Sequence, residues 1–117
     1  MKKIILILAL PYTLYLIPST RDTIFAQNVE FSKENFPSDK NGLKEAKRNI
    51  EQGDGYYLMG NQMYNKALPL YLKADSFNSN NAMLNYKIGV CYLYSPYSKK
   101  ATSGLETAYQ LNPDVAK

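Results

Sequence analysis

The sequence predicts an all-α fold for the part of the chain that follows its N-terminal leader. Apolar and small residues recur at spacings of three and four from residue 43 onward, which is helical periodicity. Helix-stopping residues, among them the Asn-Ser-Asn-Asn run at 78–81 and the Ser95-Pro96 pair, divide this pattern into segments. No window alternates strictly enough between polar and apolar residues to predict a strand.

The leader, residues 1–26, is typical of a secretory signal peptide. Lys2 and Lys3 precede an apolar run over residues 4–17, which Pro11 interrupts and which is shorter than the roughly 20 residues of a membrane-spanning helix. Cleavage is expected after Ala26, where a small residue suits the peptidase, and an uncleaved membrane anchor is the alternative. We therefore expect an exported protein, associated with a membrane only indirectly or through an uncleaved leader.

The charge balance gives little reason to expect nucleic-acid binding. The whole chain has 14 Lys and Arg against 10 Asp and Glu, a net charge of +4. Three of these bases and one acid lie in the leader, which leaves 11 bases against 9 acids in the rest. Most of the net basicity is therefore a property of the leader.

The composition also argues against most enzymatic chemistry. The chain has no His, so a His general base, a Ser-His or Cys-His nucleophile and a His-ligated metal are excluded. Cys91 is the single cysteine and has no partner for an intramolecular disulfide. No glycine-rich phosphate loop or calcium loop occurs. We expect a non-catalytic module with no metal, no cofactor and no small-molecule substrate.

Residues 27–42 predict an irregular lead-in to the helical domain. Phe31 and Phe36 are isolated aromatics in this segment, and their rings are expected to dock on the first helix. Ser38 or Asp39 can cap that helix, because their side-chain oxygens accept a hydrogen bond from an unpaired backbone N–H.

Four helices are expected after the lead-in, over about residues 43–57, 65–77, 82–94 and 98–111. Pro69 is placed in the first turn of the second helix, where its missing N–H has no helical acceptor to lose. The Gly53-Asp54-Gly55 sequence predicts a flexible segment or a kink in the first helix, since one carboxylate provides too few ligands for calcium.

A pattern of residues recurs within the helical domain, residues 43–117. Four positions of the second helix are matched in the fourth, Ala67 by Ala101, Tyr71 by Leu105, Ala74 by Ala108, and Phe77 by Leu111. This 34-residue period of paired helices resembles the tetratricopeptide (TPR) repeat, with copies over about 48–81 and 82–115. Two alignments of the first copy are possible, and they differ by two residues. Direct alignment pairs Gly55 with Gly89, whereas an insertion near Gly60 pairs Gly53 with Gly89.

Four sequence motifs occur together in the helical domain: Leu43-Lys44-Glu45-Ala46, Gly53-Asp54, ALPLYLKA at 67–74 and LNYKIGVCYL at 84–93. This combination resembles the N-terminal TPR region of Bacteroidetes OmpA-family outer-membrane, peptidoglycan-associated proteins. Members of that family place the TPR segment before a β-propeller and a peptidoglycan-binding domain, and some serve type IX secretion and gliding. This sequence ends at Lys117, before either domain, so the resemblance implies only the scaffold role of the TPR region.

The first helix of each TPR copy is expected to line a concave groove. The candidate groove residues are Tyr56 and Met59 in the first copy and Met83, Tyr86, Lys87, Val90 and Leu93 in the second. An aromatic and Met-lined groove with one Lys suits an extended peptide or a partner helix. The alternative is that these side chains pack against a following domain or against the lead-in.

Two residue types have a competing interpretation. Nine Tyr follow the leader, and their helical spacing favours core or interhelical packing over a carbohydrate or nucleic-acid platform. Cys91 lies between Val90 and Tyr92, which favours a buried, inert thiol over an intermolecular disulfide.

These patterns predict a non-catalytic protein–protein interaction scaffold, and the resemblance together with the leader implies that it belongs to the bacterial cell envelope, in the periplasm or at the outer membrane. The partner would be a protein or a peptide. The alternative is the N-terminal structural fragment of a longer OmpA-like protein without binding activity of its own, because a solenoid generally needs about three repeats to bury a continuous core.

Overall fold

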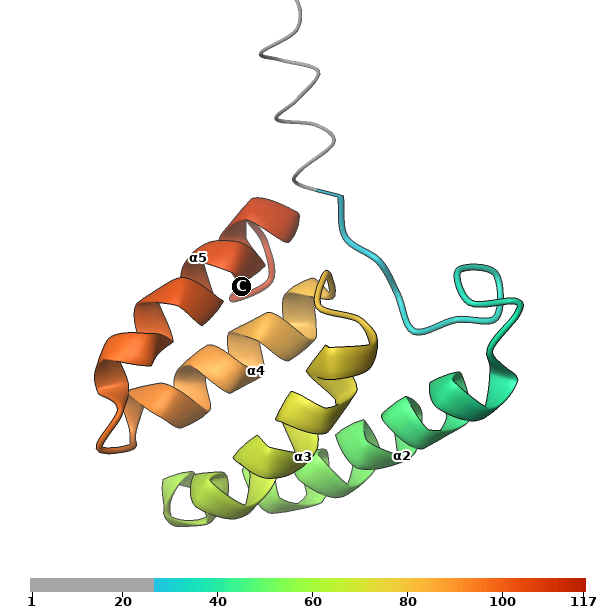
Figure 1. Ribbon diagram of the computed structural model, residues 1–117. Helices are drawn as coiled ribbons and strands as arrows, with labels where there is room; N and C mark the ends of the chain where they lie inside the picture. The colour runs from blue at the N-terminus through green and yellow to red at the C-terminus, as the bar shows by residue number, and fades with distance from the viewer. Residues whose placement is uncertain (1–26) are drawn as a thin grey trace, which may run out of the picture.

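The computed structural model describes residues 27–117, which are all-helical with no strand. The elements are α2 (Lys40–Tyr57), the 3₁₀ helix η1 (Asn61–Met63), α3 (Tyr64–Phe77), α4 (Ala82–Leu93), the 3₁₀ helix η2 (Ser98–Lys100) and α5 (Ala101–Leu111) (Figure 1). The predicted signal peptide, residues 1–26, lies outside the described residues. None of the helices described here is long and apolar enough to cross a membrane.

The four α-helices form two consecutive hairpins, α2 with α3 and α4 with α5, and α3 packs against α4 (Figure 1). Gly60 lies in the turn of the first hairpin with φ +106°, a backbone conformation that favours glycine. The turns of both hairpins lie at one end of the molecule, at the left of Figure 1, and the lead-in meets α2 at the other end. The predicted all-α class is confirmed for these residues.

Asparagine and aspartate side chains define the helix ends. Asp39 caps α2, since its Oδ1 accepts a hydrogen bond from the N–H of Gly42 at 2.8 Å, as predicted for this position. Asn81 caps α4 in the same way, with Leu84 as the donor at 3.0 Å. Asn78 and Asn112, which correspond in the 34-residue period, each follow the last residue of a helix in extended conformation.

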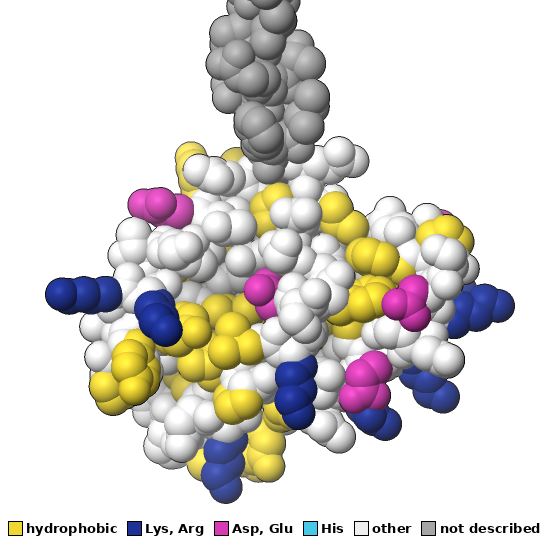
Figure 2. Space-filling model, in the orientation of Figure 1, with side chains coloured by type: hydrophobic (Ala, Val, Ile, Leu, Met, Phe, Trp, Pro, Cys, Tyr) yellow, Lys and Arg dark blue, Asp and Glu magenta, His cyan; other side chains and the backbone are white. Residues whose placement is uncertain are grey.

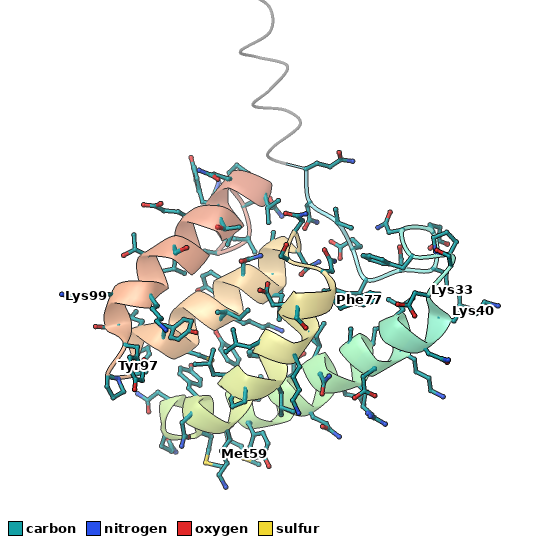
Figure 3. All side chains as sticks on the ribbon, viewed as in Figure 1. Lys33, Lys40, Met59, Phe77, Tyr97 and Lys99 are labelled. Carbon is teal, nitrogen blue, oxygen red and sulfur yellow. The ribbon has the colours of Figure 1, made fainter. Side chains whose placement is uncertain are left out.

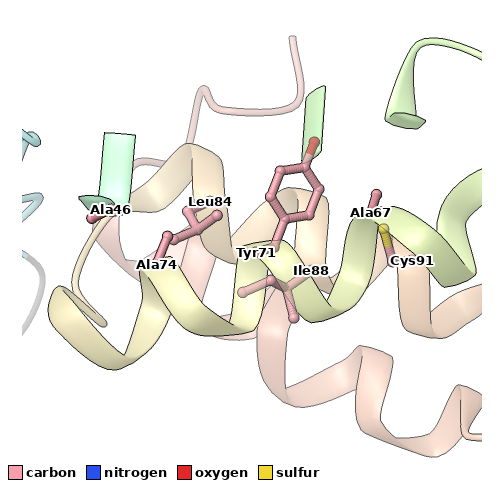
Figure 4. Close-up of a cluster of buried hydrophobic side chains, with 7 residues drawn as sticks. All are labelled: Ala46, Ala67, Tyr71, Ala74, Leu84, Ile88 and Cys91. Carbon is pink, nitrogen blue, oxygen red and sulfur yellow. The ribbon is translucent and has the colours of Figure 1, made fainter. Parts of the chain in front are cut away.

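The core lies between α2, α3 and α4 (Figure 4). Its buried members are Ala46, Ala67, Tyr71, Ala74, Leu84, Ile88 and Cys91. The three alanines allow close helix approach, while the fully buried Tyr71 ring fills the space between the helices. The prediction that Cys91 is buried is confirmed, and burial raises the pKa of its thiol to about 12.

Two glycines mark close contacts between the helices of each hairpin. A Cβ atom on Gly53 would lie 2.7 Å from Cε1 of Tyr71, and one on Gly89 would lie 2.8 Å from Cδ2 of Leu105. Tyr71 and Leu105 follow the 34-residue period, whereas the two glycines are separated by two positions more. The geometry therefore pairs Gly53 with Gly89, the register with the two-residue insertion near Gly60.

The helix α2 continues without a break through Gly53 and Gly55 to Tyr57, and Gly53 packs against the Tyr71 ring. The expected position of Pro69 in the first turn of its helix is wrong. Since α3 begins at Tyr64, Pro69 is its sixth residue and lies in the second turn. The carbonyl of Asn65 lacks the usual helical N–H partner there, and it lies at an exposed residue that water can reach.

The lead-in packs on both helices of the first hairpin rather than on the first helix alone. The rings of Phe36 and Phe77, the last residue of α3, have centroids 4.7 Å apart. Phe31 packs against the core cluster and lies with Lys47 and Ile50 of α2 around a shallow hollow. The first hairpin is therefore covered by its own N-terminal segment at one end.

Candidate functional site

The candidate site is the face on which α2 and α4 meet, here called the shared face. On α4 it contains the predicted residues Met83, Tyr86, Lys87, Val90 and Leu93. With the offset set by Gly53 and Gly89, their counterparts on α2 are Lys47, Ile50, Glu51, Asp54 and Tyr57. A contact between Lys87 and Asp54 joins the two rows.

A charged pair ties the two helices together at the shared face. Nζ of Lys87 lies 2.8 Å from Oδ1 of Asp54, and the hydroxyl of Tyr71 donates a hydrogen bond to the same oxygen at 2.6 Å. The Lys87 and Asp54 side chains keep 20% and 34% of their surface exposed, so the pair is only partly shielded from water. The carboxylate of Asp54 therefore accepts from both α3 and α4.

Aromatic rings surround this pair. The Lys87 ammonium lies 5.9 Å from the ring centroid of Tyr57 and 6.0 Å from that of Tyr71, within the range of a cation–π contact. Burial raises the pKa of both tyrosines far above its ordinary value, and for Tyr71 the hydrogen bond to Asp54 adds to this. Both phenols stay neutral at physiological pH, so the positive charge of Lys87 is balanced by Asp54.

The contacts of this cluster connect the two helices. Lys87 already has a carboxylate partner and is not a free anion site. Within residues 27–117, no group of three or more His, Cys, Asp or Glu side chains is arranged to hold a metal ion. The pair positions the two helices and fixes the spacing of the side chains around it.

The α2 half of the shared face is partly covered by the lead-in, whereas the α4 half is open to solvent. On α2, a shallow hollow is lined by Phe31 together with Lys47, Ile50, Glu51 and Asp54. On α4, Met83 and Leu93 are 46% and 52% exposed, and Tyr86 and Val90 are half-buried. The lead-in thus covers part of the α2 half, and the α4 half presents apolar side chains to solvent.

Tyr56 and Met59 are grouped elsewhere. They line a second shallow hollow, between α2 and α3, together with Gln52, Gly55 and Leu70. Lys66 of α3 lies over Tyr56 at 5.9 Å from the ring centroid.

The direction of the Tyr56 side chain differs from that of Tyr57. Neighbouring helical residues point about 100° apart, so the Tyr57 ring contacts Lys87 and the Tyr56 ring does not share that contact. The expected grouping of Tyr56 and Met59 with the α4 residues is wrong, because it depends on a register of α2 that differs from the observed one by two residues.

The loop between the hairpins holds the lead-in by its backbone. The carbonyl of Val29 accepts hydrogen bonds from the side-chain amides of Asn78 at 2.9 Å and Asn81 at 3.0 Å. The N–H of Val29 donates to the carbonyl of Asn80 at 2.8 Å, and Oδ1 of Asn28 accepts from the N–H of Ala82. Both Asn78 and Asn81 are 5% exposed. The sequence pattern identifies this run only as a helix stop.

Tyrosines link the ends of three helices near the hairpin turns. Tyr57 and Tyr64 stack with centroids 4.8 Å apart, Tyr57 meets Tyr71 edge-on at 6.0 Å, and Tyr64 meets Tyr94 edge-on at 5.6 Å. For these four residues, the predicted interhelical packing is confirmed. Aromatic pairs of this kind add about 0.5–1.5 kcal/mol each beyond their buried area.

Comparisons of the chain with protein-family models, with curated proteins and with solved structures give no match.

Proposed function

We propose that the chain is a non-catalytic, TPR-like scaffold that binds a protein or peptide partner in the bacterial cell envelope. The observation that carries the proposal is the repetition of one packing arrangement in two consecutive hairpins. Buried Gly53 and Asn49 of α2 correspond to buried Gly89 and Asn85 of α4, with the same offset for both pairs. In helical repeat proteins, such stacking creates an extended concave surface for partners.

The surface chemistry of the α4 half supports peptide recognition. Met83 and Leu93 expose about half of their surface, and Tyr86 lies on the same helix. Rigid aromatic side chains gain contact area at low entropic cost, and flexible Met side chains adapt to apolar partners of different shape. An extended peptide or a partner helix with apolar side chains is the ligand that suits this surface.

The cell-envelope part of the proposal depends on the leader. The basic start and short apolar run of residues 2–17 are the pattern of an exported protein. The resemblance to the TPR region of OmpA-family proteins suggests the same compartment.

The test is capture of a partner by chemical cross-linking in envelope extract of the source organism. A variant that combines Tyr86→Ser and Val90→Ser should lose the captured protein while its circular dichroism stays unchanged. The matched control, Tyr109→Ser with Val115→Ser, alters the same residue types outside the shared face and should retain capture. Equal capture by both variants would remove Tyr86 and Val90 from the binding site.

A hollow on the outer side of α5 favours a second candidate, the N-terminal structural part of a longer envelope protein. The hollow is lined by Thr102, Leu105, Glu106, Tyr109 and Gln110. By the 34-residue period, Thr102 corresponds to Leu68 of α3, which is half-buried against the core. On this view, the outer side of α5 would receive a further domain.

Thermal unfolding of residues 27–117 at several protein concentrations separates the two candidates. A cooperative melt that does not depend on concentration would support an autonomous binding module. A shallow or concentration-dependent melt would support the structural fragment, since a half-covered repeat face tends to need a neighbour.

A further inference from the structure

The two hairpin turns meet at one end of the molecule and expose a group of apolar side chains there. Tyr64, at the start of α3, contacts Tyr94, just after α4, with 5.6 Å between ring centroids. We call this end the turn pole, and its exposed apolar members are Leu58, Met59, Leu93, Tyr94 and Tyr97. Figure 3 labels Met59 and Tyr97 at this end, away from Lys33 and Lys40 at the opposite end.

Exposed apolar side chains are concentrated at the turn pole. Eight large apolar side chains are exposed among residues 27–117, and five of them belong to the pole. Their exposed fractions run from 52% for Leu93 to 84% for Leu58. Figure 2 shows hydrophobic side chains toward the lower left, the side on which Figure 1 places the hairpin turns, with Lys and Arg side chains near them. Single exposed apolar residues are ordinary, whereas a group of this kind marks an interaction surface.

The charges at the turn pole all have one sign. The turn segments 57–66 and 92–100 contain three lysines, Lys66, Lys99 and Lys100, and no Asp or Glu. All three lysines are exposed. The ammonium of Lys100 lies 5.4 Å from the ring centroid of Tyr97 and 5.7 Å from that of Tyr92. The lysine stems therefore extend the apolar surface, and their charges ring it.

We propose that the turn pole docks directly on an anionic lipid surface. Aliphatic tips such as Leu58 and Met59 would enter the boundary between headgroups and acyl chains, and Tyr97 would lie at headgroup level. Lys99 and Lys100 would pair with the lipid phosphates. This docking is peripheral and has only Leu93 in common with the shared face, so it does not depend on the proposed scaffold function.

Two other occupants fit the turn pole less well. A nucleic acid would stack on the tyrosines but gain nothing from the aliphatic tips of Leu58, Met59 and Leu93, which are exposed beside them. A second copy of the chain, meeting pole to pole, would bring two sets of lysines together without a carboxylate between them, and like charges oppose that contact.

Tryptophan reporters in the full chain test the proposal by position. The chain contains no Trp, so Tyr97→Trp and Tyr109→Trp each introduce one reporter, at sites that are 63% and 64% exposed. The probe is vesicles of phosphatidylglycerol with brominated phosphatidylcholine. The fluorescence emission of the Tyr97→Trp reporter should shift to the blue and be quenched by bromine when vesicles are added. The emission of Tyr109→Trp, on the outer side of α5, should stay unchanged.

Charge reversals then test the role of the lysines. Lys99→Glu with Lys100→Glu, in the Tyr97→Trp chain, should weaken partition into the anionic vesicles at least about tenfold. Lys33→Glu with Lys40→Glu makes the same change in net charge at the opposite end and should have a much smaller effect. Replacing Leu58 and Met59 by Ser should reduce quenching at an unchanged circular dichroism spectrum.

Several results would overturn the proposal. Equal quenching at both reporters would show that the chain associates with vesicles without using the turn pole. Equal effects of the two charge reversals would show attraction by net charge alone. A spectral shift of Tyr97→Trp that occurs without vesicles and grows with protein concentration would assign the pole to self-association. A shift with a single-stranded oligonucleotide, and none with vesicles, would assign it to nucleic acid.

Discussion

Gly53 and Gly55 lie two residues apart in α2, yet a neighbouring side chain requires glycine only at Gly53. A Cβ atom on Gly53 would lie 2.7 Å from the fully buried Tyr71 ring, whose hydroxyl is held by Asp54. We expect Gly53→Ala to lower the free energy of unfolding by about 1–3 kcal/mol through overpacking. A Cβ atom on Gly55 would have no neighbouring atom within 4 Å. Gly55→Ala should therefore raise the free energy of unfolding by about 0.5–1 kcal/mol, the gain in helix propensity.

Urea denaturation of the two glycine variants beside the parent chain provides the measurement. If both substitutions stabilised the chain to the same extent, the Tyr71 ring would not be fixed against Gly53, and the pairing of Gly53 with Gly89 would lose its structural basis.

Asp75 has a carboxyl oxygen, Oδ1, that is buried and has no hydrogen-bond partner in the structure. Burial raises the pKa of this carboxyl above its ordinary value. The folded chain therefore holds the proton more tightly than the unfolded chain, and Asp75 becomes more destabilising as the pH rises through its raised pKa. We expect Asp75→Asn to stabilise the chain at pH 7 by up to about 1 kcal/mol.

The stability gain of Asp75→Asn should vanish in acid, below the ordinary pKa of an aspartate, where the parent carboxyl is also neutral. Chemical denaturation at a series of pH values measures this dependence. Asp114→Asn changes a carboxylate whose side chain is 72% exposed and is the control, expected to show little effect. A constant gain at every pH would mean that ionisation of Asp75 is not the cause.

At the scale of helices, Asp54 and Lys87 form the charged contact between α2 and α4. The pair is partly buried, and the Tyr71 hydroxyl donates to the same carboxylate. We expect Asp54→Asn and Lys87→Met each to lower the free energy of unfolding by about 1–2 kcal/mol. In a double-mutant cycle, the coupling free energy between the two substitutions should be about 1 kcal/mol. Equilibrium unfolding of the four chains in the cycle gives the coupling.

The Glu45–Arg48 ion pair of α2 offers a matched control for the Asp54–Lys87 cycle. Its side chains are 55% and 62% exposed, so solvent screens the pair and the coupling should not exceed about 0.5 kcal/mol. Equal coupling in the two cycles would mean that Asp54 and Lys87 interact as an ordinary surface pair.

The sequence predicts the helices well but the site less well, for a physical reason. Helix ends depend on local chemistry, so the capping role of Asp39 and the stop before Asn78 follow from the residues themselves. The inward face of α2 depends on register, and a shift of two residues rotates a helix by about 200°. The expected groove residue Tyr56 therefore gives way to Asp54 and Tyr57.

One signal in the sequence could have resolved the register of α2. A buried asparagine recurs at Asn49 and Asn85, and the glycines Gly53 and Gly89 follow each by four residues. Aligning Asn49 with Asn85 and Gly53 with Gly89 gives the same offset between the two segments for both pairs, and this alignment needs only the sequence. The hydrogen bonds from Asn78 and Asn81 to the Val29 carbonyl have no such signal in the sequence, because they join a backbone group to residues far away in the chain.

At the scale of the whole molecule, the two hairpins are not equally buried. The central cluster draws its buried residues from α2, α3 and α4, and α5 contributes none. The helix α5 packs mainly on α4, through Gly104 and the Leu105 side chain against Gly89. Its outer side remains exposed, with Tyr109 at 64%. Local stability should therefore be lowest in this helix.

Native-state hydrogen exchange measures the local stability of α5 directly. Amides in α5 should exchange at least about tenfold faster than those in α3, because opening α5 uncovers one helix interface instead of two. Leu105→Ala should speed exchange in α5 further and leave α3 nearly unchanged, while Ile88→Ala, in the central cluster, should speed exchange throughout. Equal exchange in α3 and α5, with equal responses to both variants, would show that the hairpins open as one unit. In that case the uncovered side of α5 would carry no cost in stability, and α5 would not need a neighbouring domain to cover it.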